Sequence, residues 1–366
     1  MADWIFIFVL HNLSIKDAIG NEFIAIVPKN DSRISNLISE HGALKYITNG
    51  FSDHFKRKVE PAVLIVNKKA PKRVLYNDAL AAFRNIIAIL NIAESWQQFL
   101  SGYQQPFIPN YSDYFDFYPI SPSKDYKYFL TWSPALHGLD EPKDFRGQTS
   151  PEIATSMNAI RFNSELEKKL LVHWEERFVK GKEGEWFNTI LFRSLEVAYH
   201  ASALPLKNGS TIYDYGYCIA LWVSAFEILA HPQIESSSYK LVMELLGKVD
   251  FNAKKLRNRY YSITLPGKKR IKLRVTLAQK LYFQMHRCRN DFIHGNPVNK
   301  RDLLPDKNEN KYSLNLYAPL LYKVALKGFL GLFKGTNDLN LLAMSDYADV
   351  RRLEKGLLSA LNKRRS

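Results

Sequence analysis

Residues 287–297 carry an arginine and a histidine at a spacing that phosphodiester chemistry could use. The segment reads RCRNDFIHGNP, so Arg289 and Asn290 precede His294 by one helical turn or slightly more. A histidine of near-neutral pKa can remove or return the proton of a ribose 2′-hydroxyl. A guanidinium can hold a phosphate and stabilise the charge that builds on its oxygens. Such a pair would cut RNA without a metal, leaving a 2′,3′-cyclic phosphate and a free 5′-hydroxyl, and would spare DNA.

A helix over residues 276–294 must position these side chains. Its apolar stripe, at steps of three and four, consists of Leu277, Leu281, Met285, Cys288 and Phe292. Gly295 and Pro297 then end the helix. At about 100° per residue, Arg289 and His294 lie about 140° apart, too far round to meet easily on one phosphate. Two copies of the helix across a two-fold axis would bring them together, so we expect a homodimer. Alternatively, the two residues are ordinary solvated groups near a helix end.

The run from Arg289 to Gly295 resembles the R-x4-6-H motif of HEPN domains, which usually has a polar residue after the arginine. Two upstream stretches, RSLEVA at 193–198 and AFEIL at 225–229, look like earlier helices of the ApeA-like HEPN group. The resemblance covers roughly residues 160–335. It implies a helical bundle, a dimer with a composite cleft and metal-independent RNA cleavage, often in bacterial toxin or antiphage roles.

Carried over to matching positions, the resemblance assigns Arg289 to the scissile phosphate and His294 to general acid–base catalysis. Asn290 would position the arginine or the histidine. Asp291, which follows Asn290, is acidic. The family pattern does not require an acidic residue at this position. Because HEPN members without nuclease activity also exist, a non-catalytic role stays open.

Glu227 is a further candidate, because it is a carboxylate within the otherwise apolar helix expected over residues 213–230. It either orients an arginine of the cleft, or reaches solvent or pairs with an arginine of the bundle. We interpret His200, His231 and His286 as isolated structural or exposed residues. No His or Cys spacing matches a zinc site, and we expect no metal and no cofactor.

Positive charge is concentrated in the C-terminal third. Residues 240–366 hold 27 Lys and Arg against 10 Asp and Glu, a net charge of +17, whereas residues 1–239 have a net charge of −2. An excess of this size favours a polyanionic partner, RNA in particular, because each neutralised phosphate releases counterions. A basic surface with no partner is the alternative.

Residues 250–275 form a basic insertion in the helical pattern. Alternating polarity over residues 262–275, interrupted by a Pro-Gly turn at 266–269, predicts a β-hairpin with one basic face. Tyr260 and Tyr261 could stack on unpaired bases. The alternative is a solvated loop with ordinary lysines. The candidate RNA-binding residues are Lys254, Lys255, Arg257, Arg259, Lys268, Lys269, Arg270, Lys272 and Arg274.

The fold class expected is multidomain α+β. With 366 residues, 46% hydrophobic and 24% charged, the chain has the composition of a folded protein of two or three domains. Residues 1–150 predict a small α+β domain, with strands at 4–10, 22–27, 62–66, 114–118 and 128–132 and a helix at 77–100. A polar stretch rich in Gly and Pro follows. Residues 151–366 predict a HEPN-like bundle, with helices at 163–179, 185–204, 213–230, 239–246, 276–294, 316–333 and 348–361.

A reducing cytoplasm fits the cysteine content best. Only Cys218 and Cys288 are present, and their separation gives neither a disulfide framework nor a metal or redox pair. No stretch reads as a signal peptide or a membrane span, so we expect no membrane partner.

Three functions are compatible with these patterns. The first is an endoribonuclease, acting as a toxin or antiphage effector, whose residues 1–150 sense, restrain or recruit through a regulatory partner or ligand. The second is a non-catalytic dimer that binds RNA or nucleotide as a scaffold or antitoxin-like partner. The third is a DNA-binding regulator that uses the basic hairpin.

Overall fold

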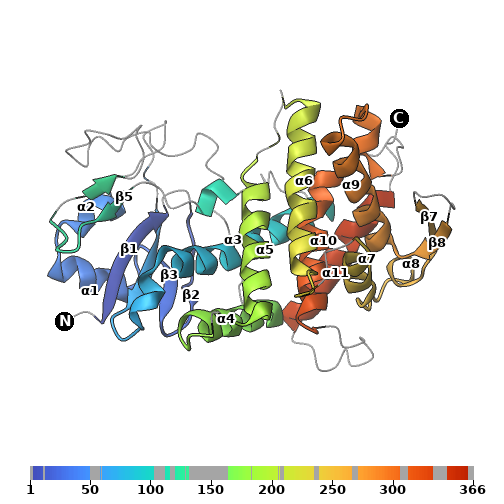
Figure 1. The fold of residues 1–366 in the computed structure, drawn as a ribbon. Helices are drawn as coiled ribbons and strands as arrows, with labels where there is room; N and C mark the ends of the chain where they lie inside the picture. The colour runs from blue at the N-terminus through green and yellow to red at the C-terminus, as the bar shows by residue number, and fades with distance from the viewer. Residues whose placement is uncertain are drawn as a thin grey trace. The chain divides into compact units, whose positions relative to one another are not determined.

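The computed structural model describes residues 3–10, 13–49, 58, 60–102, 112–115, 120–127, 129–131, 164–182, 184–204, 206, 210–234, 239–265, 271–305, 312–332 and 344–361. The chain is mixed α+β and mostly helical (Figure 1), which confirms the predicted composition of the fold. It forms two compact units. The first unit comprises Met1–Arg84, Ser112–Phe162 and Trp174–Gly181, and the second comprises Asn85–Tyr111, Asn163–His173 and Lys182–Ser366.

The first unit contains a four-stranded antiparallel sheet in its described part, in the order β1-β4-β3-β2. The strands predicted at 4–10, 22–27 and 62–66 are confirmed as three of its members. The central pair is in a register that places Ile26 opposite Leu64, and both side chains are fully buried. The strands are β1 (Trp4–Leu10), β2 (Ile19–Gly20), β3 (Ile24–Pro28) and β4 (Ala62–Asn67).

Two helices that the sequence did not predict, α1 (Ser32–Glu40) and α2 (Leu44–Asn49), pack on one face of this sheet. Asp31 caps α1 by accepting a hydrogen bond from the backbone of Arg33. Since strand side chains alternate between faces, Val63 and Ile65 both point into this core. The helices contribute Ile34, Leu37, Leu44 and Ile47 to it.

A strand predicted at 114–118 is wrong over its described part. The structure instead has a 3-10 helix, η2 (Ser112–Phe115), in which the ring of Phe115 is completely buried. Residues 116–118 of the predicted strand lie outside the described residues. The strand predicted at 128–132 is confirmed as β6 (Phe129–Thr131), which pairs antiparallel with β5 (Ile120–Pro122).

The helices predicted from periodicity are all present, and each begins and ends within four residues of its expected bounds. Two of them begin with a capping box, in which Thr211 pairs with Asp214 and Thr276 pairs with Gln279. The helices are α3 (Asn77–Leu100), α4 (Glu165–Phe178), α5 (Trp186–Ser202), α6 (Ile212–Leu229), α7 (Tyr239–Gly247), α9 (Leu277–Ile293), α10 (Leu314–Phe329) and α11 (Met344–Leu358).

Helix α10 is the central helix of the second unit, because it is buried on every side and contacts α6, α7, α9 and α11. Its Lys323 ammonium is buried with the carboxylate of Asp349 from α11. Glu94 lies 3.6 Å from the same ammonium, and Gln97 donates to Asp349. Burial alone would raise the pKa of Asp349, but the ammonium groups of Lys323 and Lys327 lower it below its ordinary value.

The predicted hairpin is confirmed in its strands, β7 (Tyr261–Leu265) and β8 (Ile271–Val275), which pair antiparallel after the short helix α8 (Lys254–Arg257). Its predicted turn at 266–269 lies outside the described residues. The apolar residues that alternate along the hairpin are only partly buried. Ile263 and Val275 are buried, whereas Ile271 is 52% exposed and Leu273 39% exposed, because the first four residues of β8 all lie at the surface of the described structure.

The predicted boundary near residue 150 lies outside the described residues and stays a prediction. Residues 85–111 group with the second unit, although the sequence analysis assigned them to the first domain. Within the described part of the chain, no helix combines the length and apolar character that crossing a lipid bilayer requires.

Candidate functional site

Helices α6 and α9 lie side by side in the second unit (Figure 1) and run antiparallel. At one end of the pair Gly216 of α6 faces Phe292 of α9, and at the other Phe226 lies 5.2 Å from the ring of Tyr282. A Cβ atom at Gly216 would come within 2.4 Å of the Phe292 ring. The glycine therefore lets the two helices approach closely and fixes their alignment.

This alignment brings Glu227 and Arg289 together. Helical side chains tilt toward the N-terminus of their own helix. Glu227 and Arg289 each lie near the C-terminal end of their helix, so on this antiparallel pair they tilt toward each other. Arg289 Nη2 lies 3.4 Å from Glu227 Oε2 and donates a hydrogen bond to it. Glu227 thus contacts an arginine rather than solvent alone, as expected both for a carboxylate that orients an arginine of the cleft and for one that pairs with an arginine of the bundle.

Two further side chains close a ring with this ion pair. Arg289 Nη1 donates to Asn290 Oδ1 at 2.9 Å, and Asn290 Nδ2 lies 3.5 Å from His286 Nδ1. His286 Nε2 in turn lies 3.5 Å from Glu227 Oε1. We call Glu227, His286, Arg289 and Asn290 the α6–α9 cluster. Its three charged or titratable side chains are 17–26% exposed, so a ligand can reach it from solvent.

The contacts of the cluster imply one tautomer for His286. Asn290 Oδ1 accepts from Arg289, so the amide presents its nitrogen to His286, and an amide nitrogen only donates. His286 Nδ1 must then carry the lone pair, and Nε2 carries the proton that faces Glu227. The contacts of His286 with Asn290 and with Glu227 are both 3.5 Å, at the long end of hydrogen-bond distances. Another group could therefore replace Asn290 or Glu227 beside the imidazole.

Two polar atoms of this region are buried and have no hydrogen-bond partner among the described residues: Arg289 Nε and the hydroxyl of Tyr282. Burial raises the pKa of Tyr282 well above its ordinary value, and the negative charge of Glu227 raises it further, while Arg289 lowers it. Tyr282 is therefore a neutral hydroxyl close enough to the cluster to interact with its charges.

His294 lies apart from the cluster. It is the C-cap residue of α9, it is exposed, and Gly295 follows it with φ of +70°. Because the Arg289 side chain tilts toward the N-terminus of α9, it leads away from His294. The described residues provide no hydrogen bond or ion pair to the His294 ring. The structure thus brings together Arg289, Asn290 and Glu227, but leaves His294 free at the helix tip.

His286 is the cluster residue that the sequence analysis set aside as structural or exposed. One signal could have identified it, since His286, Arg289 and Asn290 are spaced at i, i+3 and i+4, which places them on one side of a helix. Its contact with Glu227 depends on how α6 and α9 align, and local spacing does not reveal that.

The basic insertion presents its charges to solvent. None of its exposed side chains forms an ion pair with a described carboxylate, and the exposed residues are Lys254, Lys255, Arg257, Arg259, Lys272 and Arg274. Lys268, Lys269 and Arg270 lie outside the described residues. The two candidate stacking residues differ, because Tyr260 is 49% exposed whereas the Tyr261 ring has the Lys280 ammonium 4.8 Å above it.

A hollow of about 240 Å³ is lined by residues of β7 and α9. Its charged lining consists of Lys280, Arg287, Asp291 and Asp302. Two basic and two acidic groups balance, and Arg287 Nε lies 4.0 Å from Asp291 Oδ2. This hollow consequently shows no preference for an anion.

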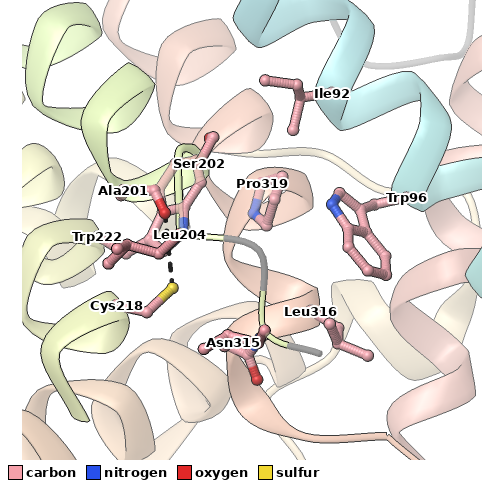
Figure 2. A pocket seen from close by; sticks show the side chains of 11 residues that line it. Ile92, Trp96, Ala201, Ser202, Leu204, Cys218, Trp222, Asn315, Leu316 and Pro319 are labelled. Atoms are coloured by element: carbon pink, nitrogen blue, oxygen red, sulfur yellow. Dashed lines mark hydrogen bonds between the residues drawn. The ribbon is translucent and has the colours of Figure 1, made fainter. Parts of the chain in front are cut away.

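A second hollow, beside Cys218, is too small for a ligand. It measures about 30 Å³ and is mostly apolar, with Trp96, Trp222 and Pro319 among its walls (Figure 2). The Cys218 thiol donates to the carbonyl of Ala201 at 3.6 Å, as the dashed line in Figure 2 shows. Burial raises the pKa of this thiol to about 12, and likewise that of Cys288. Neither cysteine is suited to act as a nucleophile.

No protein-family model, curated protein or solved structure matches the chain. The described residues contain no group of three or more His, Cys, Asp or Glu side chains placed to hold a metal ion. The α6–α9 cluster combines an arginine held by an amide and a carboxylate with an imidazole on the same carboxylate.

Proposed function

We propose that the chain is a metal-independent endoribonuclease that cleaves RNA by attack of the ribose 2′-hydroxyl on the adjacent phosphate. The observation that carries this proposal is the α6–α9 cluster, which holds a guanidinium at a partly exposed position on the helix that ends at His294. In this proposal the protein acts in the cytoplasm as a toxin or antiphage effector, and it resembles HEPN ribonucleases.

Each residue has a defined part in the reaction. Arg289 binds the scissile phosphate and stabilises the charge that develops on its oxygens. Asn290 and Glu227 position the guanidinium through their contacts at 2.9 Å and 3.4 Å. His294 transfers a proton. Its exposure at the helix tip supports a site shared across a homodimer, in which His294 of one chain approaches Arg289 of the other.

The basic insertion binds the RNA backbone. Its exposed lysines and arginines have no described carboxylate to compete with phosphate, and strand pairing sets Lys272 beside Thr264 and Arg274 beside Ser262. Both side chains thus lie on one face of the hairpin. Binding through such contacts is strong at low salt and weakens steeply as salt rises.

Cleavage of RNA in the presence of EDTA tests the proposal. We expect the purified protein to cut RNA, to leave 2′,3′-cyclic phosphate ends and to spare DNA of the same sequence. His294→Ala should reduce the rate by roughly a hundredfold or more, which is the usual contribution of a general acid or base. Intact RNA under every condition tried, or equal cutting by the variant, would contradict the proposal.

A non-catalytic function is the second candidate, and one observation favours it. Arg289 is already paired with Glu227, so a phosphate has to compete with a carboxylate for the guanidinium. In that case the chain is a dimer that binds RNA or nucleotide as a scaffold or antitoxin-like partner. Tight RNA binding by both the original protein and His294→Ala, with no cleavage by either, would identify it.

A further inference from the structure

The proposed reaction requires two proton transfers, one from the 2′-hydroxyl and one to the departing 5′-oxygen. The R-x4-H spacing supplies only His294. Neutral imidazole is the group best suited to accept a proton near neutral pH, so a second histidine beside the phosphate-binding arginine would complete the chemistry.

His286 has the geometry of such a base. Its Nε2 carries a proton that faces Glu227 Oε1 at 3.5 Å, and its Nδ1 carries the lone pair. A carboxylate on one imidazole nitrogen fixes the tautomer and stabilises the imidazolium that forms when the other nitrogen accepts a proton. Glu227 also contacts Arg289, so the imidazole and the guanidinium are held on one carboxylate within one chain.

The amide of Asn290, which faces the lone pair of His286 Nδ1, is easily displaced from it. Asn290 Nδ2 lies 3.5 Å from His286 Nδ1, a long contact whose loss costs little. The side chain of His286 is 17% exposed, so a substrate hydroxyl can approach it. Asn290 would keep its shorter bond to Arg289, at 2.9 Å, while a 2′-hydroxyl takes its place on the imidazole.

We propose that His286 is the general base of this site, an inference that rests on the proposed ribonuclease function. His286 Nδ1 takes the proton of the 2′-hydroxyl while the 2′-oxygen forms a bond to phosphorus. The bond between phosphorus and the 5′-oxygen then breaks, and His294 gives its proton to that oxygen. The products are a 2′,3′-cyclic phosphate and a 5′-hydroxyl, and the two histidines exchange protonation states.

A glutamine at this position separates catalysis from positioning. In His286→Gln the side-chain amide can still donate to Glu227 but cannot act as a base near neutral pH. His200→Gln is the matched control, because His200 is an exposed histidine of α5 that is no part of the cluster. The measurement is the rate of RNA cleavage with EDTA from about pH 5 to about pH 9, a range that brackets the ordinary pKa of histidine.

The base must be unprotonated, so the rate of the original protein should rise with pH along an acid limb. We expect His286→Gln to lose roughly a hundredfold or more in rate and to lose that acid limb, whereas His200→Gln keeps both. His294→Gln should instead lose the basic limb, since its proton is needed for the leaving group. Circular dichroism and thermal unfolding will show whether each variant is folded.

Three outcomes overturn the inference. If the original protein cuts RNA and His286→Gln matches its rate and pH profile, the base assignment fails while the ribonuclease stands. A slower variant that keeps its acid limb would show that His286 only positions its neighbours. If the original protein cuts no RNA, both proposals fail. Should His286→Gln not fold, His286→Asn, whose amide oxygen can accept from Asn290, provides the same test.

Discussion

Two buried tyrosines of the second unit differ in what their hydroxyl groups contact. Tyr322 lies 2.6 Å from Ser194 Oγ, and because that serine donates to the carbonyl of Ala225, the tyrosine must donate to the serine. The hydroxyl of Tyr282 has no hydrogen-bond partner among the described residues. A buried hydroxyl without a partner costs stability, whereas one that is bonded contributes to it.

Tyr282→Phe should therefore leave the free energy of unfolding unchanged or raise it by about 1 kcal/mol. Tyr322→Phe is the matched control, and it should lower the same quantity by about 1 kcal/mol because it removes a satisfied bond. Urea unfolding of both variants at neutral pH measures the difference. Equal losses in the two variants would show that Tyr282 has a partner.

At the residue scale, the sequence singled out three of the four residues of the α6–α9 cluster but not the contacts that join them. Arg289 and Asn290 were identified from their spacing, and Glu227 from its apolar surroundings. His286 was missed because its importance lies in a contact between two helices. The contact between His286 and Glu227 depends on the close approach of α6 and α9 at Gly216. The sequence shows a glycine within an apolar helix but not which residue of another helix it faces.

At the scale of elements, the long helices were predictable, and so was the nine-residue α7, whereas α1 and α2 were not predicted. Helices such as α3 and α9 show an apolar period over many turns, whereas α1 and α2 have nine and six residues. Helices this short are unstable alone and form because Ile34 and Leu37 dock on the sheet. The hairpin was predictable from alternation, but not the exposure of Ile271 and Leu273, which depends on packing beyond the strands.

The hairpin is also the element whose charge can be tested. Replacing Lys272 and Arg274 with Glu should weaken RNA binding and reduce the slope of log affinity against log salt by about one for each lost phosphate contact. The control replaces Lys68 and Lys69, exposed lysines in the turn after β4, which changes net charge by the same amount. Binding titrations at several salt concentrations measure both slopes. An equal change in the two variants would mean that only net charge matters.

At the scale of the whole molecule, the proposed site makes a prediction about mixed dimers. If Arg289 of one chain works with His294 of the other, co-expressing Arg289→Ala and His294→Ala chains yields dimers with one complete site. RNA cleavage should then return, although each variant alone is inactive. Co-expression of Arg289→Ala with His286→Gln should restore nothing, because Arg289 and His286 act within one chain.

Light scattering on the same preparations provides the control for this experiment. We expect a dimer at micromolar concentration, both for the original chain and for each variant. A monomer, or inactivity of the Arg289→Ala and His294→Ala mixture despite confirmed mixed dimers, would contradict a shared site.

The buried ammonium of Lys323 has a consequence for synthesis. Its nearest counter-charge, Asp349, follows it by 26 positions, on the next long helix of the chain. Until residue 349 leaves the ribosome, the emerging bundle would have to bury a cation that, among the carboxylates the structure describes, faces Glu94 alone, which is unfavourable. The docking of α11 on α10, more than the growth of apolar surface, would therefore decide when the second unit becomes resistant to proteases.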